Sequence, residues 1–147
     1  MGANKAAVDF SQIFLEDSKK FFKNQLKNSW YDEWARENAI LKRVKPNICP
    51  LSTYDMPRRM QTKLIRLRIG HCFFSHGFLI LRENTPWCSI CNSRITVDHV
   101  LIECPLYSSA RLKFNIGNIS ILNLLGNQEN FENLFGYLDK IGLLNLI

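Results

Sequence analysis

The sequence predicts a mainly α-helical domain with a small zinc-knuckle-like insertion, in which a knuckle is followed by a short helix. Three observations support this class. Apolar residues recur at helical spacing near both ends of the chain. Pro57 opens another such pattern, which Gly70 closes. Between these patterns lie four metal-type ligands, arranged as Cys-x2-Cys-x7-His-x4-Cys.

The first expected helical stretch covers most of residues 8–44. Phe22, Leu26, Trp30 and Trp34 recur every four residues and form one apolar stripe, which predicts a core-facing side. Pro46 ends the pattern, and a loop is expected after it.

Four further segments carry local structure signals. Residues 57–69 and the stretch from Phe131 to Ile141 have helical periodicity, and 107–114 reads as a short helix. Residues 71–85 are apolar but short, so periodicity leaves a helix and a buried strand both open. Breaks are expected at 117–118 and 126–127.

Composition restricts the class of protein. The chain has 147 residues, 46% hydrophobic and 22% charged, which is typical of one globular domain. Its net charge of +6, from 19 basic and 13 acidic residues, favours a polyanionic partner, meaning nucleic acid or an acidic membrane surface. The longest apolar runs, such as 78–81, are too short to cross a bilayer, so we expect no membrane partner.

The cysteines point to a metal site in a reducing compartment. Five cysteines are an odd count, no secretory signal opens the chain, and the clustering favours zinc over disulfides. We therefore expect an intracellular protein, in the nucleus or the cytoplasm. Cys49 and Cys72 fit no ligand pattern and are expected in the core. His71 and His76 are expected to cap or to hydrogen-bond.

The expected ligands of one structural Zn²⁺ are Cys88, Cys91, His99 and Cys104. Three thiolates and one imidazole suit zinc, and four protein ligands complete its tetrahedron, so the site is structural and not catalytic. Thr96 is a good N-cap for a helix over 97–103, with Asp98 and Glu103 left to face solvent or to steady the imidazole. The alternative is a set of buried free cysteines and a surface histidine.

A dense basic segment accompanies the metal cluster. Five positive charges occur in the 57–69 helix without an acidic residue among them: Arg58, Arg59, Lys63, Arg66 and Arg68. Such a density suits contacts with nucleic-acid phosphates. The alternative is a solvated basic face that pairs with acidic residues of the first helix.

The combination of two motifs resembles one family, namely the carboxy-terminal tail of non-LTR retrotransposon polyproteins of the jockey or I-element type. The segments that carry the resemblance are RLRIGH at 66–71, SHG at 75–77, TPWCSIC at 85–91 and TVDHVLIECP at 96–105, together with WYDEW at 30–34 and FGYL at 135–138. In that family a reverse transcriptase, and often a ribonuclease H domain, precedes this tail. Residues 2–7 resemble the end of such a ribonuclease H domain, and its last catalytic carboxylate would fall at Ala7.

The resemblance implies a tail that lacks both sets of catalytic acids and is not an enzyme. We expect residues 1–16 to be a remnant of the ribonuclease H end, 17–85 a helical region with the basic helix, 86–107 the zinc segment, and 108–147 the C-terminal helices. The expected function is binding of RNA or DNA phosphates. The alternatives are a zinc-stabilised protein-interaction module and a decayed copy without function.

Overall fold

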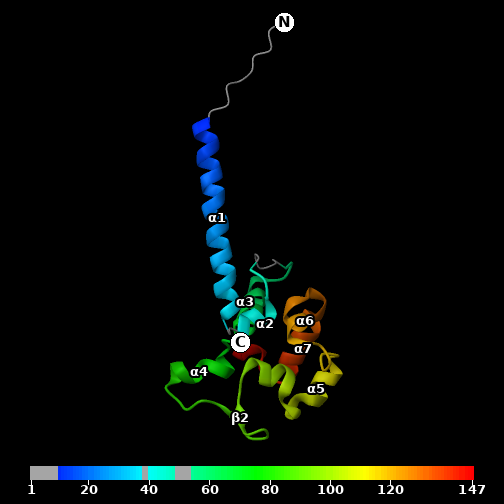
Figure 1. Cartoon of the computed structure of the whole chain (residues 1–147). Coiled ribbons are helices and arrows are strands. Elements are labelled where there is room, and N and C mark those ends of the chain that lie inside the picture. Colours follow the sequence, from blue (N-terminus) through cyan, green and yellow to red (C-terminus); the bar gives the residue numbers. More distant parts are fainter. Residues whose placement is uncertain (1–9, 38–39, 49–53) are drawn as a thin grey trace. The chain divides into compact units, whose positions relative to one another are not determined.

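The computed structural model describes residues 10–37, 40–48 and 54–147, and it divides the chain into two compact units, 1–37 and 38–147. Within the described residues, the first unit is the helix α1 (Phe10–Arg36) (Figure 1). The predicted helical stretch over 8–44 is thus two helices, since α2 (Ile40–Val44) belongs to the second unit. The predicted ribonuclease H remnant lies mostly outside the described residues.

The apolar stripe of α1 is exposed. Phe22 is 63% exposed, Leu26 73% and Trp30 58%, so the prediction of a core-facing side is wrong for these residues. The physical reason is that the described part of this unit contains no second element on which the helix could bury them.

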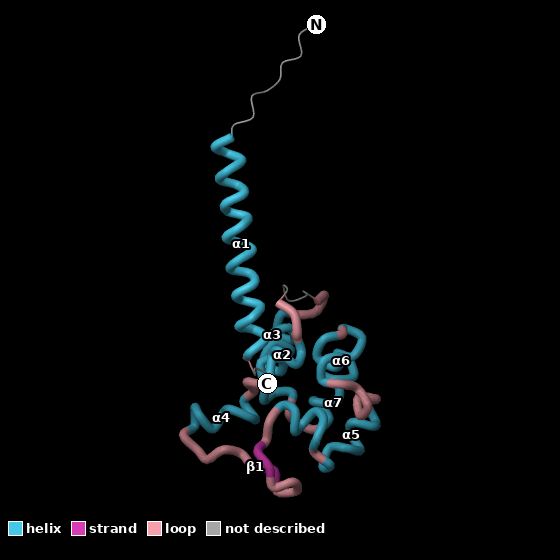
Figure 2. Tube along the Cα trace, viewed as in Figure 1, coloured by secondary structure: helices cyan, strands magenta, loops and turns pink. Residues whose placement is uncertain are grey.

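The second unit is mainly helical, as predicted, and its described residues include one short hairpin (Figure 2). After α2, its α-helices are α3 (Arg58–Ile69), α4 (Phe73–Leu81), α5 (Ser108–Lys113), α6 (Ile121–Gly126) and α7 (Phe131–Lys140). The strands β1 (Trp87–Cys88) and β2 (Ser93–Arg94) form the hairpin. A π-helical turn at His99–Glu103 and 3-10 turns at Pro105–Tyr107, Gln128–Asn130 and Leu144–Leu146 complete the unit.

Local signals explain where the middle helices begin and end. Gly70 ends α3 in the left-handed conformation with φ 78°, and its N–H returns to carbonyls of the last turn, as the sequence predicts. Residues 73–81 are a helix, which resolves the choice that periodicity leaves open. Ser75 helps to start α4, because its hydroxyl accepts the N–H of Cys72 at 3.2 Å.

One apolar core contains residues from the three segments that the sequence analysis divides at 85–86 and 107–108. It contains Leu64 and Leu67 from α3, Val97 and Leu101 from the metal segment, and residues of α6 and α7 such as Leu134, all nearly inaccessible to water. The segments on either side of the boundaries expected at 85–86 and 107–108 therefore share one core and belong to one compact unit. The boundary of the structure lies between residues 37 and 38.

No single helix in the described ranges is long and apolar enough to cross a membrane. Within the same ranges, α3 and α4 taken together have the length and composition of a span, but they are bent by 82° at their junction.

Gly136 in α7 tests how tightly the C-terminal helices pack. A Cβ at this position would lie 2.7 Å from Cε1 of the Phe114 ring, which packs against the core, so Gly136→Ala should destabilise the protein by about 2 kcal/mol. At Gly126, in α6, a Cβ would meet no atom within 4 Å, so Gly126→Ala should be neutral or slightly stabilising. Chemical denaturation of both variants measures the difference. Equal stability of the two would contradict the described packing.

Candidate metal centre

The first half of the centre is the turn between β1 and β2. Cys88 pairs with Ser93 in the antiparallel register, and the N–H of Asn92 donates to the carbonyl of Cys88 at 2.9 Å. Asn92 adopts a positive φ of 49°, which asparagine tolerates better than most residues. The tight turn brings the side chains of Cys88 and Cys91 to the same side, as expected for a knuckle.

The second half is the short helix over residues 97–103, which the sequence predicts. The hydroxyl of Thr96 accepts the N–H of His99 at 3.0 Å, which confirms the N-cap. The helix widens into a π-helical turn from His99 to Glu103, where the N–H of Cys104 reaches the carbonyl of His99 at 2.8 Å. Such wide turns are frequent at functional sites. Pro105 follows and prevents the helix from continuing.

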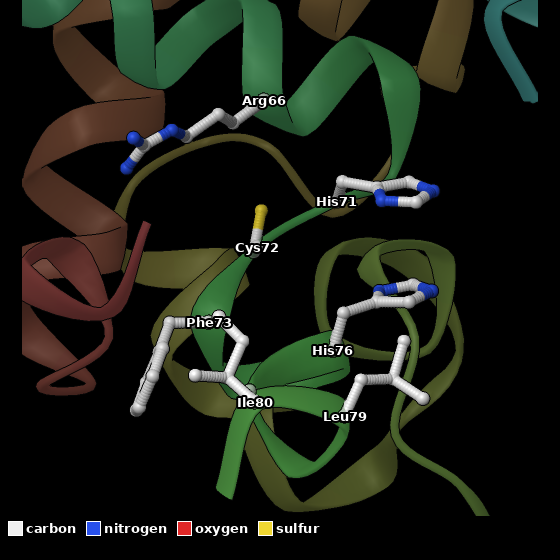
Figure 3. A pocket seen from close by; sticks show the side chains of 8 residues that line it. Arg66, His71, Cys72, Phe73, His76, Leu79 and Ile80 are labelled. Atoms are coloured by element: carbon white, nitrogen blue, oxygen red, sulfur yellow. The ribbon is translucent and has the colours of Figure 1, made fainter.

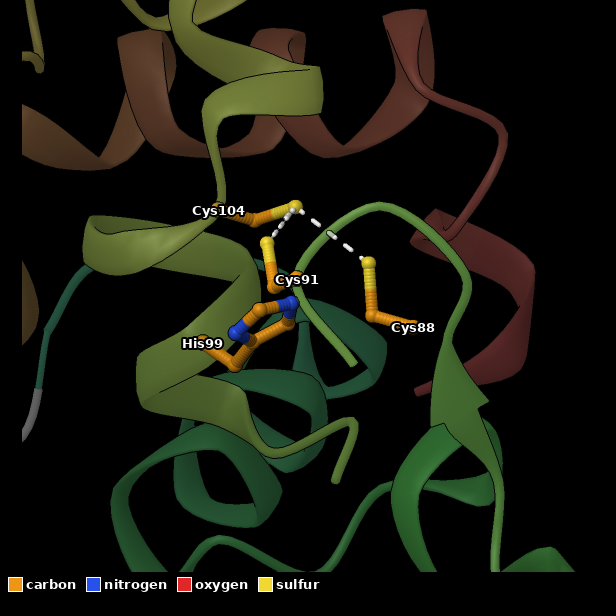
Figure 4. A group of neighbouring side chains, drawn as sticks. All are labelled: Cys88, Cys91, His99 and Cys104. Atoms are coloured by element: carbon orange, nitrogen blue, oxygen red, sulfur yellow. Dashed lines mark hydrogen bonds between the residues drawn. The ribbon is translucent and has the colours of Figure 1, made fainter. Parts of the chain in front are cut away.

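The four predicted ligands converge (Figure 4). One ligand atom from each of Cys88, Cys91, His99 and Cys104 lies within 4.8 Å of the others. The Sγ of Cys104 is 3.7 Å from the Sγ of Cys88 and 3.7 Å from that of Cys91. Zinc–sulfur bonds of about 2.3 Å at tetrahedral angles separate two sulfurs by about 3.8 Å. The sulfur spacing therefore fits a tetrahedral zinc site.

The imidazole of His99 is oriented for the same purpose. Its Nε2 is buried and has no hydrogen-bond partner of normal geometry, which would be costly unless the atom binds something else. Its Nδ1 lies 3.3 Å from the Ser93 hydroxyl and 3.7 Å from Oε2 of Glu103. The Ser93 hydroxyl is placed to orient the ring in the way that outer partners orient metal-bound histidines. Glu103 faces solvent, with its side chain 63% exposed, and its carboxylate lies beside the imidazole without a hydrogen bond to it.

The other acidic residue of this helix has a different role. Asp98 pairs with Arg43 at the end of α2. The pair therefore ties the metal segment to a helix that precedes it by more than fifty residues.

The thiols differ in their acidity. Backbone N–H groups of Cys91 and Ile90 and the imidazole of His99 lower the pKa of Cys88 to about 6. Burial and the neighbouring sulfurs of Cys104 and Cys88 raise the pKa of Cys91 to about 12. Three thiolates this close repel one another, so complete ionisation needs a cation among them.

Two buried residues support the centre and escape sequence analysis. Arg111 in α5 donates to the carbonyl of Cys104 at 2.7 Å and to that of Val100 at 3.3 Å. Tyr137 in α7 donates its hydroxyl to the same Val100 carbonyl at 2.6 Å. A zinc ion held by three thiolates and a neutral imidazole would carry a net charge of −1, and the Arg111 guanidinium on the Cys104 carbonyl would help to offset it. No spacing pattern marks these residues, because their partners are backbone carbonyls.

The structure separates the five basic residues of α3. Lys63 is only 6% exposed, and its ammonium donates to the carbonyls of Leu144 and Ile147. Burial, then the charges of Arg59 and Arg66, lower its pKa. Lys63 therefore stabilises the interior of the domain, and its prediction as a phosphate contact is wrong.

Arg68 requires the same correction. It is 5% exposed, and its Nε and Nη2 donate to the carbonyl of Leu125 at 2.8 and 2.7 Å. Its guanidinium also lies over the Tyr54 ring, 5.3 Å from the centroid. Arg58, Arg59 and Arg66 remain exposed on α3.

The other expectations for cysteine and histidine have mixed outcomes. Cys72 is buried in the core, as predicted, and burial raises its pKa to about 12. His76 lies 2.9 Å from the Ser75 hydroxyl through its Nδ1, which is the hydrogen-bonding role expected. His71 is exposed and stacks on His76. Cys49 lies outside the described residues.

Comparison with known proteins adds no assignment. No family model, no curated protein and no solved structure matches this chain. The resemblance to retrotransposon tails therefore stays a prediction.

Proposed function

We propose that this chain is a non-catalytic nucleic-acid-binding module whose second unit is stabilised by one zinc ion. The observation that supports the zinc most directly is the convergence of three sulfurs and an imidazole to within 4.8 Å of one another, with the Nε2 of that imidazole buried and without a hydrogen-bond partner. Bound there, the ion would supply structure, because four protein ligands leave no position for a water or substrate. Cys88 and Cys91 would hold it from the hairpin, and His99 and Cys104 from the helix.

The nucleic-acid part of the proposal rests on α3. Arg58, Arg59 and Arg66 are exposed there, and the helix contains no acidic residue to neutralise them. Arg59 and Arg66 are seven residues apart, which places them on one face and about 10 Å apart along the axis. Together with the net charge of +6, this arrangement favours contacts with successive phosphates.

The double variant Arg58→Gln/Arg59→Gln tests this role. We expect weaker binding of RNA or DNA and a salt dependence of log Kd that is shallower by about 1 for each phosphate contact removed. The matched control is Lys113→Gln/Lys140→Gln, which removes the same charge from exposed positions of α5 and α7. Fluorescence anisotropy over a salt series measures both. Equal slopes for the two variants would show that α3 has no special part.

A protein-interaction module is the second candidate, and one observation favours it. Leu79, Ile80 and Leu81 of α4 are 63%, 78% and 52% exposed, an unusual concentration of apolar surface. A partner of this kind would bind with little dependence on salt. Absence of oligonucleotide binding by the wild-type protein would favour this candidate.

The biological setting is proposed from the resemblance alone. In an intact polyprotein such a tail would help to hold template RNA or target DNA, while an isolated copy could lack a function. Thiolate ligands need a reducing environment, so we place the protein inside the cell, in the nucleus or the cytoplasm. Purified protein that cleaves an RNA–DNA hybrid in the presence of magnesium would overturn the non-catalytic assignment.

A further inference from the structure

A pocket of about 360 Å³ opens where α3 turns into α4. Figure 3 shows Arg66 on the α3 side, Phe73 and Ile80 on the α4 side, and the rings of His71 and His76 parallel to each other. Small-ligand sites are clefts of about 300–1,000 Å³ that combine apolar walls with a few polar groups. This pocket has that composition and the size for one small unit of a ligand.

Three aromatic rings are stacked beside the pocket. The imidazoles of His71 and His76 lie 4.3 Å apart with an angle of 8° between their planes. His76 is followed by Phe78, 6.3 Å away at 30°, and Arg94 of β2 lies over the Phe78 ring at 5.5 Å. His71 is exposed, so the stack ends at a ring that is open to solvent.

We propose that this pocket binds one nucleotide of an unpaired strand, with its base stacked on His71 and its phosphate at Arg66. The proposal rests on the nucleic-acid-binding function above and gives it a preference for single strands. Every base offers a π-face, so a stacking site of this kind tolerates sequence. Bases of a duplex are already stacked on their neighbours and cannot enter.

The charges around the rings suit such a ligand. The residues that line the pocket contain no carboxylate, and Arg66 supplies a permanent positive charge. Burial, and the charges of His71 and Arg94, lower the pKa of His76, which disfavours the charged form of this ring. A neutral ring packs in the stack without repelling its neighbours.

Two substitutions at one exposed position separate stacking from charge. His71→Ala should weaken binding of a single-stranded oligonucleotide of about 12 nucleotides roughly tenfold, while duplex affinity and the salt slope stay unchanged. His71→Phe keeps a ring and should retain the single-strand affinity. Equal losses in the two variants, or no loss in His71→Ala, would overturn the proposal.

A second measurement works even if no oligonucleotide binds. The chain has three histidines, so their imidazole resonances can be followed individually by NMR while 5′-AMP is added. We expect His71 to shift and His99, buried in the metal centre, to stay in place. A strand-only site would shift His71 with the oligonucleotide and not with 5′-AMP, which still supports the pocket. If neither ligand shifts His71, the pocket is rejected. If the wild-type protein binds no oligonucleotide but 5′-AMP shifts His71, only the proposed function is rejected.

Discussion

Removal of zinc by a chelator should unfold most of the second unit. Val97 and Leu101 lie between the metal ligands in sequence and are almost inaccessible to water in the shared core. Structural zinc contributes on the order of 10 kcal/mol at neutral pH, which is comparable with the entire stability of a small domain. Native mass spectrometry should find one zinc per chain, and circular dichroism should show loss of helix when the zinc leaves.

The sharpest variant for this prediction is Cys104→Ser. The Sγ of Cys104 lies 3.7 Å from both other sulfurs, so the variant removes the sulfur that the two have in common as a neighbour. The control is Cys72→Ala, because Cys72 is equally buried but lies outside the cluster. That control should keep one zinc and lose about 1 kcal/mol for a small cavity. A Cys104→Ser protein that retains zinc and melts like the wild type would contradict a structural zinc.

The metal centre is the part of the molecule that the sequence predicts best, for a physical reason. All four ligands fall within residues 88–104, so their chemistry and spacing are both local. The turn at Asn92 and the N-cap at Thr96 are also local, since each depends on backbone groups only a few residues away. The presence of α3 and its end at Gly70 are predicted for the same reason, because periodicity and capping also depend on neighbouring residues.

The roles of the basic residues are not predicted, because they depend on contacts distant in sequence. Lys63 reaches carbonyls 81 and 84 residues later, and Arg68 reaches one 57 residues later. A backbone carbonyl carries no signature in the sequence, so a buried cation and a phosphate-binding cation look alike on a helical wheel. Their long aliphatic stems also allow both to pack against a core.

Exposure of α1 is another property that periodicity does not reveal. The stripe of Phe22, Leu26 and Trp30 has the spacing of a buried face, yet burial needs an opposing surface. A pattern records which side of a helix is apolar and does not identify the element that covers it.

Arg68→Met should destabilise the second unit by about 3 kcal/mol, because it leaves the buried carbonyl of Leu125 without either of its two donors. The contact with the Tyr54 ring and the hydrogen bond to its hydroxyl at 3.2 Å are lost as well. Arg66→Met is the matched control: it lies two residues away on the same helix and is exposed, so its effect should stay within about 0.5 kcal/mol. Urea denaturation of the zinc-loaded proteins measures both.

Arg68→Lys separates the charge of Arg68 from its geometry. Lysine keeps the positive charge but cannot place two N–H groups on one carbonyl in the same fixed fork, so we expect an intermediate loss of stability. Zinc content should remain at one per chain in all three variants, because the hydrogen bonds of Arg68 go to Leu125 and Tyr54, which lie outside the metal cluster. If Arg68→Met were as stable as Arg66→Met, Arg68 would be an ordinary surface cation, and its assignment to nucleic-acid phosphates would have to be restored.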